Sequence, residues 1–184
     1  MGSSASSYLF TLATLAVTFV GFSALVIILR QTIGGTMSEL DILLTRIFIQ
    51  LGFTVAAGAM LPALFSLFPL PERVAWRISS LFVAIPILVF ALSYPARRRA
   101  ASGSRTPKQV WFDVMVLLVA GAALLVNAMA SEIALAPAVF AASLTAILYL
   151  GGLAYLQALS TQLRHSATRS PDEGRRMPTS RSGR

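Results

Sequence analysis

A run of 22 uncharged residues, from Tyr8 to Leu29, opens this chain and ends at Arg30. As an α-helix such a run extends about 33 Å, enough to cross the hydrocarbon core of a bilayer, which is about 30 Å thick. Several further apolar runs follow it. Because 56% of the residues are hydrophobic, only 12% are charged and the mean hydropathy is +0.75, the composition also predicts an integral membrane protein.

Five apolar segments have the length and hydropathy of membrane-spanning helices: 8–29, 47–68, 78–94, 111–130 and 133–157. We therefore predict an all-α integral membrane protein, a bundle of about five transmembrane helices within residues 1–163. A short, basic, disordered cytoplasmic tail is expected over 164–184. The third segment has only 17 residues and contains Pro86, so both a full crossing and a re-entrant segment stay open.

The distribution of basic residues predicts the orientation, because short loops rich in Arg and Lys stay on the cytoplasmic side. Five crossings place thirteen of the fifteen basic residues on one side, and only Arg73 and Arg77 on the other. We expect the amino terminus outside and the carboxyl terminus in the cytoplasm. The excess of Arg over Lys and the many alanines favour a bacterial inner (plasma) membrane.

Two local patterns give further expectations. Ser38 followed by Asp41 is typical of a helix start, which belongs either to a short interfacial helix or to an extension of the second segment. The fourth and fifth segments are joined by so short a turn that they should form an antiparallel hairpin, with Asn127 hydrogen-bonded inside it. Five aromatic residues near segment ends are interpreted as anchors at the membrane interface: Tyr8, Trp76, Tyr94, Trp111 and Phe112.

The residues that carry most enzyme chemistry are missing from the apolar segments. The chain has no cysteine, its one histidine, His165, lies in the basic tail, and no charged residue falls near the middle of any predicted span. Ionisable groups inside the membrane usually mark proton relays or ion sites. We therefore predict a protein that is not an enzyme, without a metal or another cofactor.

Neutral polar residues recur at helical spacing in the first two segments. Thr11, Thr14 and Thr18 share one helix face, and Arg46, Gln50 and Thr54 follow one another at intervals of four. The favoured interpretation of this candidate polar face is helix packing, in which small residues and hydroxyls allow close contacts. The alternative is a polar path for a small solute, with Arg46 at its cytoplasmic mouth.

Small residues suggest further contacts between helices. Gly151 and Gly152, flanked by Tyr149 and Tyr155, indicate either a close helix contact, which we favour, or a groove for a lipid- or sterol-like molecule. Ladders of small residues occur in three other places: Gly52 with Ala56, Ser80 with Ala84, and Ala138 with Ala142 and Ala146. Their partners are helices of this chain, of a second copy or of another protein.

A basic loop between the third and fourth segments holds five candidate contacts for anionic lipid headgroups: Arg97, Arg98, Arg99, Arg105 and Lys108. Each basic residue near a membrane surface attracts anionic lipid by about 1 kcal/mol. The simpler interpretation is that these residues only set the topology. Nucleic acid is not an expected partner, because retained basic loops alone give membrane proteins a high pI.

These patterns predict a role but no substrate. The favoured hypothesis is a non-enzymatic accessory or scaffold subunit, which contacts the bilayer, anionic headgroups and other membrane helices, from its own kind or another protein. The alternative is a homo-oligomeric channel or carrier for a small neutral solute. It uses the threonine face of the first span together with Gln50 and Thr54.

Overall fold

Five helices make up the fold. The computed structural model describes residues 3–32, 39–102, 108–129 and 135–169. The helices are α1 (Ser3–Thr32), α2 (Glu39–Phe65), α3 (Glu72–Ser102), α4 (Lys108–Met129) and α5 (Ala136–Arg169). Each contains a stretch long and apolar enough to cross a membrane: 4–29, 42–65, 72–101, 110–129 and 136–156. The predicted all-α membrane bundle of five helices is confirmed.

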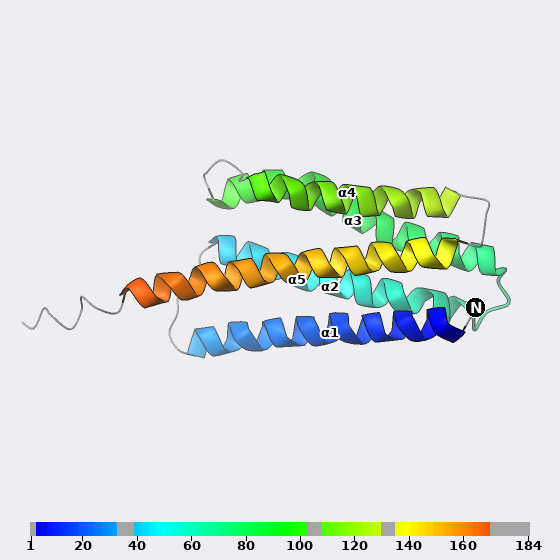
Figure 1. Cartoon of the computed structure of the whole chain (residues 1–184), viewed down its shortest axis with the longest axis horizontal. Helices are drawn as coiled ribbons and strands as arrows, with labels where there is room; N and C mark the ends of the chain where they lie inside the picture. Colours follow the sequence, from blue (N-terminus) through cyan, green and yellow to red (C-terminus); the bar gives the residue numbers. More distant parts are fainter. Residues whose placement is uncertain (1–2, 33–38, 103–107, 130–134, 170–184) are drawn as a thin grey trace, which may run out of the picture.

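The helices run alternately up and down a single elongated bundle (Figure 1). Consecutive helices pack side by side, and α5 returns across the middle of the bundle, where it contacts each of the other four helices. α1 lies at one edge, packed mainly on α2. The odd number of crossings places Ser3 and Arg169 at opposite ends of the bundle.

The helix bounds settle two expectations that the sequence left open. α3 has 31 residues, so the third segment is a full-length helix with Pro86 inside it rather than a short re-entrant segment. α2 begins at Glu39 and continues without a break into its apolar part, so it is an extension of the second span and not a separate interfacial helix. Ser38 lies outside the described residues.

The ends of α2 and α5 differ from the predicted ones. α2 ends at Phe65, and a turn follows in which the Ser66 N–H donates to the Pro62 carbonyl at 3.1 Å. α5 runs on to Arg169, so the expected boundary between residues 163 and 164 falls inside this helix. Residues 170–184 of the predicted tail lie outside the described residues.

The core joins all five helices and contains two aromatic side chains in contact. Trp76 is only 2% exposed and meets Phe140 edge to face, with ring centroids 5.6 Å apart. Its indole Nε1 donates to Glu72 Oε1 at 3.4 Å. The interpretation of Trp76 and Tyr94 as interface anchors is therefore wrong, because both side chains are buried. Tyr8, Trp111 and Phe112 are exposed, as such anchors require.

Small residues bring the helix backbones close together inside this core. A Cβ atom at Gly52 of α2 would overlap the Val20 side chain of α1, and one at Gly58 would overlap Val83 of α3. The absence of a side chain at these two positions allows Val20 and Val83 to pack directly on the α2 backbone. The small-residue ladder at Gly52 and Ala56 is thus a contact within this chain.

Candidate functional site

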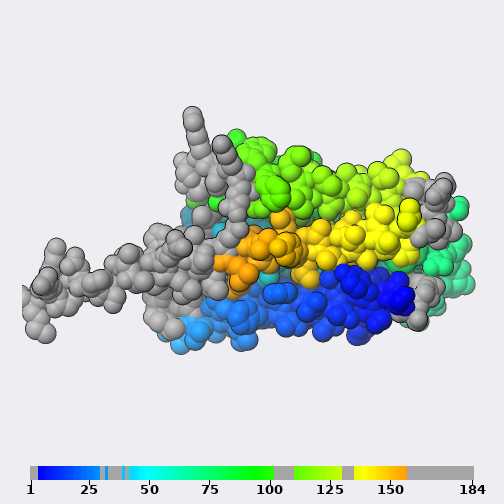
Figure 2. Space-filling model, viewed as in Figure 1, coloured from blue at the N-terminus to red at the C-terminus, as the bar shows by residue number. Residues whose placement is uncertain are grey.

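A groove lies between α1 and α5. It has a volume of about 430 Å³, within the range of about 300 to 1,000 Å³ that is usual for ligand pockets. Figure 2 shows α1 in blue and α5 in yellow and orange on the same face of the molecule. The lining residues are Tyr8, Thr11, Leu12, Leu15, Phe19, Phe22, Thr145, Leu148, Tyr149, Gly152, Leu153, Tyr155 and Leu156.

On α1, the groove forms because this helix is apolar around most of its circumference but packs through one stripe only. The buried stripe is Leu9, Leu12, Ala13, Ala16 and Val20. Phe19 and Phe22 lie beside it and stay exposed at 43% and 56%. A helix that is hydrophobic all round and half unburied is suited to a lipid environment. The side chains next to the packed stripe are then available as groove walls.

On α5, two adjacent glycines have different roles. A Cβ at Gly151 would lie 3.7 Å from the Phe48 ring of α2, an ordinary packing contact, so Gly151 is at a helix contact as favoured. A Cβ at Gly152 would meet nothing within 4 Å, because it would point into open space in the groove. Gly151 thus lies at a helix contact, and Gly152 lies beside a groove.

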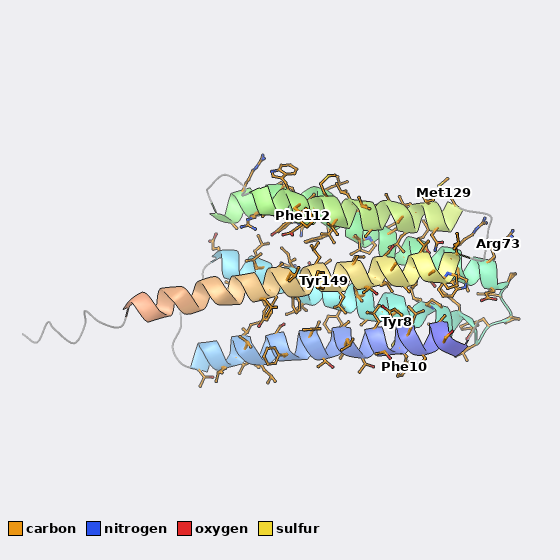
Figure 3. The ribbon with its side chains drawn as sticks, viewed as in Figure 1. Tyr8, Phe10, Arg73, Phe112, Met129 and Tyr149 are labelled. Atoms are coloured by element: carbon orange, nitrogen blue, oxygen red, sulfur yellow. The ribbon has the colours of Figure 1, made fainter. Side chains whose placement is uncertain are left out.

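One end of the groove is closed by a hydrogen bond between helices. The Tyr8 hydroxyl lies 2.8 Å from Thr145 Oγ1. Since the single hydroxyl proton of Thr145 is donated to the Ala141 carbonyl at 2.7 Å, Tyr8 is the donor in this pair. Figure 3 shows Tyr8 on the side of α1 toward α5, whereas Phe10 points away from the bundle.

The other end contains a polar atom without a partner. The Tyr155 ring stacks on Phe48 with centroids 4.8 Å apart and an interplanar angle of 27°. Its hydroxyl is buried and has no hydrogen-bond partner among the described residues. Such a buried, unsatisfied group costs about 1 to 3 kcal/mol. Tyr155 also lines the groove, and its hydroxyl is the buried polar group there that lacks a partner.

The predicted threonine face does not pack inside the bundle. Thr11, Thr14 and Thr18 are all exposed, on the side of α1 opposite its buried stripe. Their hydroxyls donate to the carbonyls one turn earlier: Ser7 at 3.0 Å, Phe10 at 3.0 Å and Thr14 at 2.8 Å. Only Thr11 borders the groove. Because the hydroxyls are satisfied within their own helix, this face can lie against lipid or another helix.

The polar residues of α2 are placed on its outward side. Arg46 and Gln50 are exposed, and Thr54 is half-buried with its hydroxyl donating to the Gln50 carbonyl at 2.8 Å. None of the three lines the groove between α1 and α5. No hydrogen bond between described residues links this row to the threonines of α1. The structure therefore does not join the two halves of the candidate polar face into one enclosed path within the chain.

The candidate headgroup contacts lie at one end of the bundle. Arg97 and Arg99 are exposed at the end of α3. Arg98 is half-buried; its Nη1 donates to the Tyr94 hydroxyl at 3.1 Å, and its charge also interacts with Asp113 of α4. Arg105 lies outside the described residues, and Lys108 is described only as the first residue of α4. Contact of these residues with anionic lipid stays a prediction.

A buried polar cluster ties α4 to its neighbours. Asn127 Nδ2 donates to Ser80 Oγ of α3 at 3.0 Å and to the Ala136 carbonyl of α5 at 3.2 Å. The predicted hydrogen bond of Asn127 inside the hairpin is confirmed. The contact with Ser80 was not predicted, because Ser80 is 47 positions away and periodicity in one helix does not identify its partner in another.

The third ladder differs from the other two. Ser80 and Ala84 are buried, whereas Ala138 and Ala142 are exposed and Ala146 is half-buried. Ala142 and Ala146 border a second, shallower hollow of about 360 Å³ between α4 and α5. The three alanines of this ladder thus lie toward the outside of the bundle rather than in its core.

The described residues contain no group of three or more His, Cys, Asp or Glu side chains placed to hold a metal ion. Comparisons of the chain with models of protein families, with curated proteins and with solved structures gave no match.

Proposed function

We propose that this chain is a non-enzymatic accessory or scaffold subunit of a bacterial inner membrane. It acts through contacts of its helices with another membrane protein and through anionic lipid headgroups at the arginine-rich end of α3. The amino terminus is outside and the carboxyl terminus is in the cytoplasm. This orientation is supported by Arg46 and the Arg97–Arg99 cluster near one end of the bundle, with Arg73 and Arg77 near the other.

The observation that carries the proposal is the position of Gln50. Its amide is exposed on the outward side of α2 and makes no hydrogen bond to another described residue. It lies one helical turn, about 6 Å, deeper in the membrane than Arg46. An amide that faces hydrocarbon is unfavourable, and a hydrogen bond from a second membrane helix relieves this cost by about 1 to 2 kcal/mol in model peptides.

The other membrane-embedded polar groups support the same role, because they hold the bundle together. Asn127 joins α4 to α3 and α5, and Tyr8 joins α1 to α5. These contacts stabilise a rigid body. Gln50, on the outside of that body, is left for contact with a partner.

The test is the mass of the complex released from native membranes by mild detergent, measured by native mass spectrometry for the wild type and for Gln50→Leu. We expect co-release with a larger, unrelated membrane protein, and loss of most of that complex in the variant. Met60→Leu is the matched control, because Met60 is an exposed residue of α2 without an amide. Release of the wild type as a monomer would contradict the proposal.

A discrete homo-oligomer in the same experiment would favour the alternative, a channel or carrier for a small neutral solute. Copies of α2 would then have to line a path with Gln50 and Thr54. Replacing both residues by leucine would abolish solute flux into liposomes in that case. Unchanged flux would exclude the path.

A further inference from the structure

We propose that the groove between α1 and α5 binds one acyl chain of a phospholipid, with the ester carbonyl of that chain accepting a hydrogen bond from Tyr155. This site is separate from the outward side of α2 and needs no partner protein. It therefore goes beyond the accessory role proposed above. Three observations support it: the length of the groove, the depth of Tyr155 and the chemistry of the walls.

The groove has the length of one leaflet. Along α5 its lining runs from Thr145 to Leu156, which corresponds to roughly 16 Å at about 1.5 Å per residue. Half of the hydrocarbon core of a bilayer is about 15 Å thick. A single acyl chain of one leaflet therefore fills the groove along α5, and the Tyr8–Thr145 hydrogen bond closes the end opposite Tyr155.

Tyr155 lies at the depth where lipid esters are found. The apolar stretch of α5 ends at Leu156, the next residue. The ring also stacks on Phe48, only two residues, or about 3 Å, from the charged Arg46 of α2. Both neighbours place Tyr155 at the boundary between hydrocarbon and headgroups. The partnerless Tyr155 hydroxyl is therefore level with the ester carbonyl of a chain that lies in the groove.

The walls between these two ends are suited to hydrocarbon. They consist mainly of Leu12, Leu15, Phe19, Phe22 and Leu148, and the gap beside Gly152 leaves room that no side chain occupies. Inside a bilayer there is no hydrophobic gain from burying one more apolar surface. Preference for a bound chain over bulk lipid therefore comes from dispersion contacts in the shaped hollow and from the hydrogen bond to Tyr155.

The experiment uses the full-length protein in liposomes that contain a trace of phosphatidylcholine with a photoactivatable group midway along one acyl chain. After illumination, adducts are mapped by mass spectrometry. We expect them to concentrate on residues 8–22 and 145–156, above the level found on exposed positions of α4 such as Met115, Val119 and Val126. Equal labelling of all lipid-exposed surfaces would overturn the proposal.

Filling the hollow should abolish binding. Gly152→Leu places a side chain in the open space of the groove, and we expect adducts in the groove to fall at least fivefold. Gly21→Leu is the matched control, because a Cβ at Gly21 also meets nothing within 4 Å but does not line the groove. Undiminished labelling in a Gly152→Leu protein that unfolds at the wild-type temperature would also overturn the proposal.

A second variant keeps the test independent of any packing change. Tyr155→Phe retains the ring that stacks on Phe48 and removes only the hydroxyl. We expect the amount of phospholipid that stays bound through purification to fall about fivefold, which corresponds to about 1 kcal/mol. Thr14→Val removes an exposed hydroxyl of α1 that does not line the groove, and it should have no effect. Equal retention in the two variants, or displacement of the probe by a sterol but not by unlabelled phospholipid, would contradict the assignment.

Discussion

The core around Trp76 and Asn127 is filled, whereas the contact of α1 with α5 encloses a hollow. The first contains a buried tryptophan, a phenylalanine and the Asn127 cluster. The second is closed by one hydrogen bond at one end and one aromatic stack on α2 at the other. Both regions are made of the same apolar residue types. The difference shows that the tightness of a helix contact here depends on whether small and polar residues lie in that contact, and not on the hydropathy of the helices.

The largest effect on the free energy of unfolding is expected when a large side chain is removed from the filled core. Trp76→Ala should lower the free energy of unfolding by about 3 to 5 kcal/mol, because it removes the largest fully buried side chain and leaves a cavity against Phe140. Equilibrium unfolding in mixed micelles measures this change. Trp111→Ala is the control, since Trp111 is 48% exposed, and a similar loss for both variants would contradict the predicted difference.

A pair of glycines compares the two regions directly. Gly58→Ala should destabilise the bundle by about 1 to 3 kcal/mol, because the new methyl group overlaps the stiff, fully buried Val83. Gly152→Ala meets only open space and should be neutral or stabilising by up to about 1 kcal/mol through helix propensity. Thermal unfolding of the two variants in the same detergent gives the comparison. Equal shifts of the unfolding temperature in the two variants would show that protein atoms already fill the space beside Gly152.

The hydrogen-bonded cluster should have a smaller effect. Asn127→Leu removes both donations from Nδ2 and should cost about 1 to 2 kcal/mol. A double-mutant cycle with Ser80→Ala isolates the pair, and we expect a coupling energy of about 0.6 kcal/mol or more. No coupling would mean that Asn127 acts through the Ala136 carbonyl alone.

The smallest effect is expected at the edge of the bundle. Tyr8→Phe removes the direct hydrogen bond between α1 and α5 and should cost about 0.6 kcal/mol. The effect should be local, so hydrogen exchange of α1 amides is the measurement, with faster exchange near Tyr8 than in the wild type. Phe10→Leu, on the side of α1 that points away from the bundle, serves as the control. Faster exchange throughout the bundle would contradict a local role.

The sequence predicts the helices well because the length and hydropathy of a span are local properties. It placed Trp76 and Tyr94 wrongly, since a residue near a span end faces either lipid or core depending on the rotation of its helix about its axis. That rotation is set by contacts with other helices. It also began the third segment at residue 78, although α3 begins at Glu72, whose side chain accepts a hydrogen bond from the Trp76 indole.

The groove was only partly predictable. The glycine pair and its flanking tyrosines indicated either a helix contact or a lipid groove on α5. The structure has a helix contact at Gly151 and a groove beside Gly152, and lipid binding in that groove stays a proposal. The other wall comes from α1, and the hydrogen bond that closes the groove joins residues 137 positions apart. A single sequence carries no signal for a pairing at that distance, because each residue is unremarkable within its own helix.

The place of α5 also determines how the bundle is completed during synthesis. Helices α1 to α4 can pair with their neighbours as they leave the ribosome, but α5 is made after them and contacts all four. Until it arrives, the surfaces around Trp76, Leu124 and Val55 have no helix over them. The first four helices are therefore present in the membrane as helix pairs before α5 is added. A product that stops before Phe140 would leave core residues exposed, and membrane quality control would recognise them.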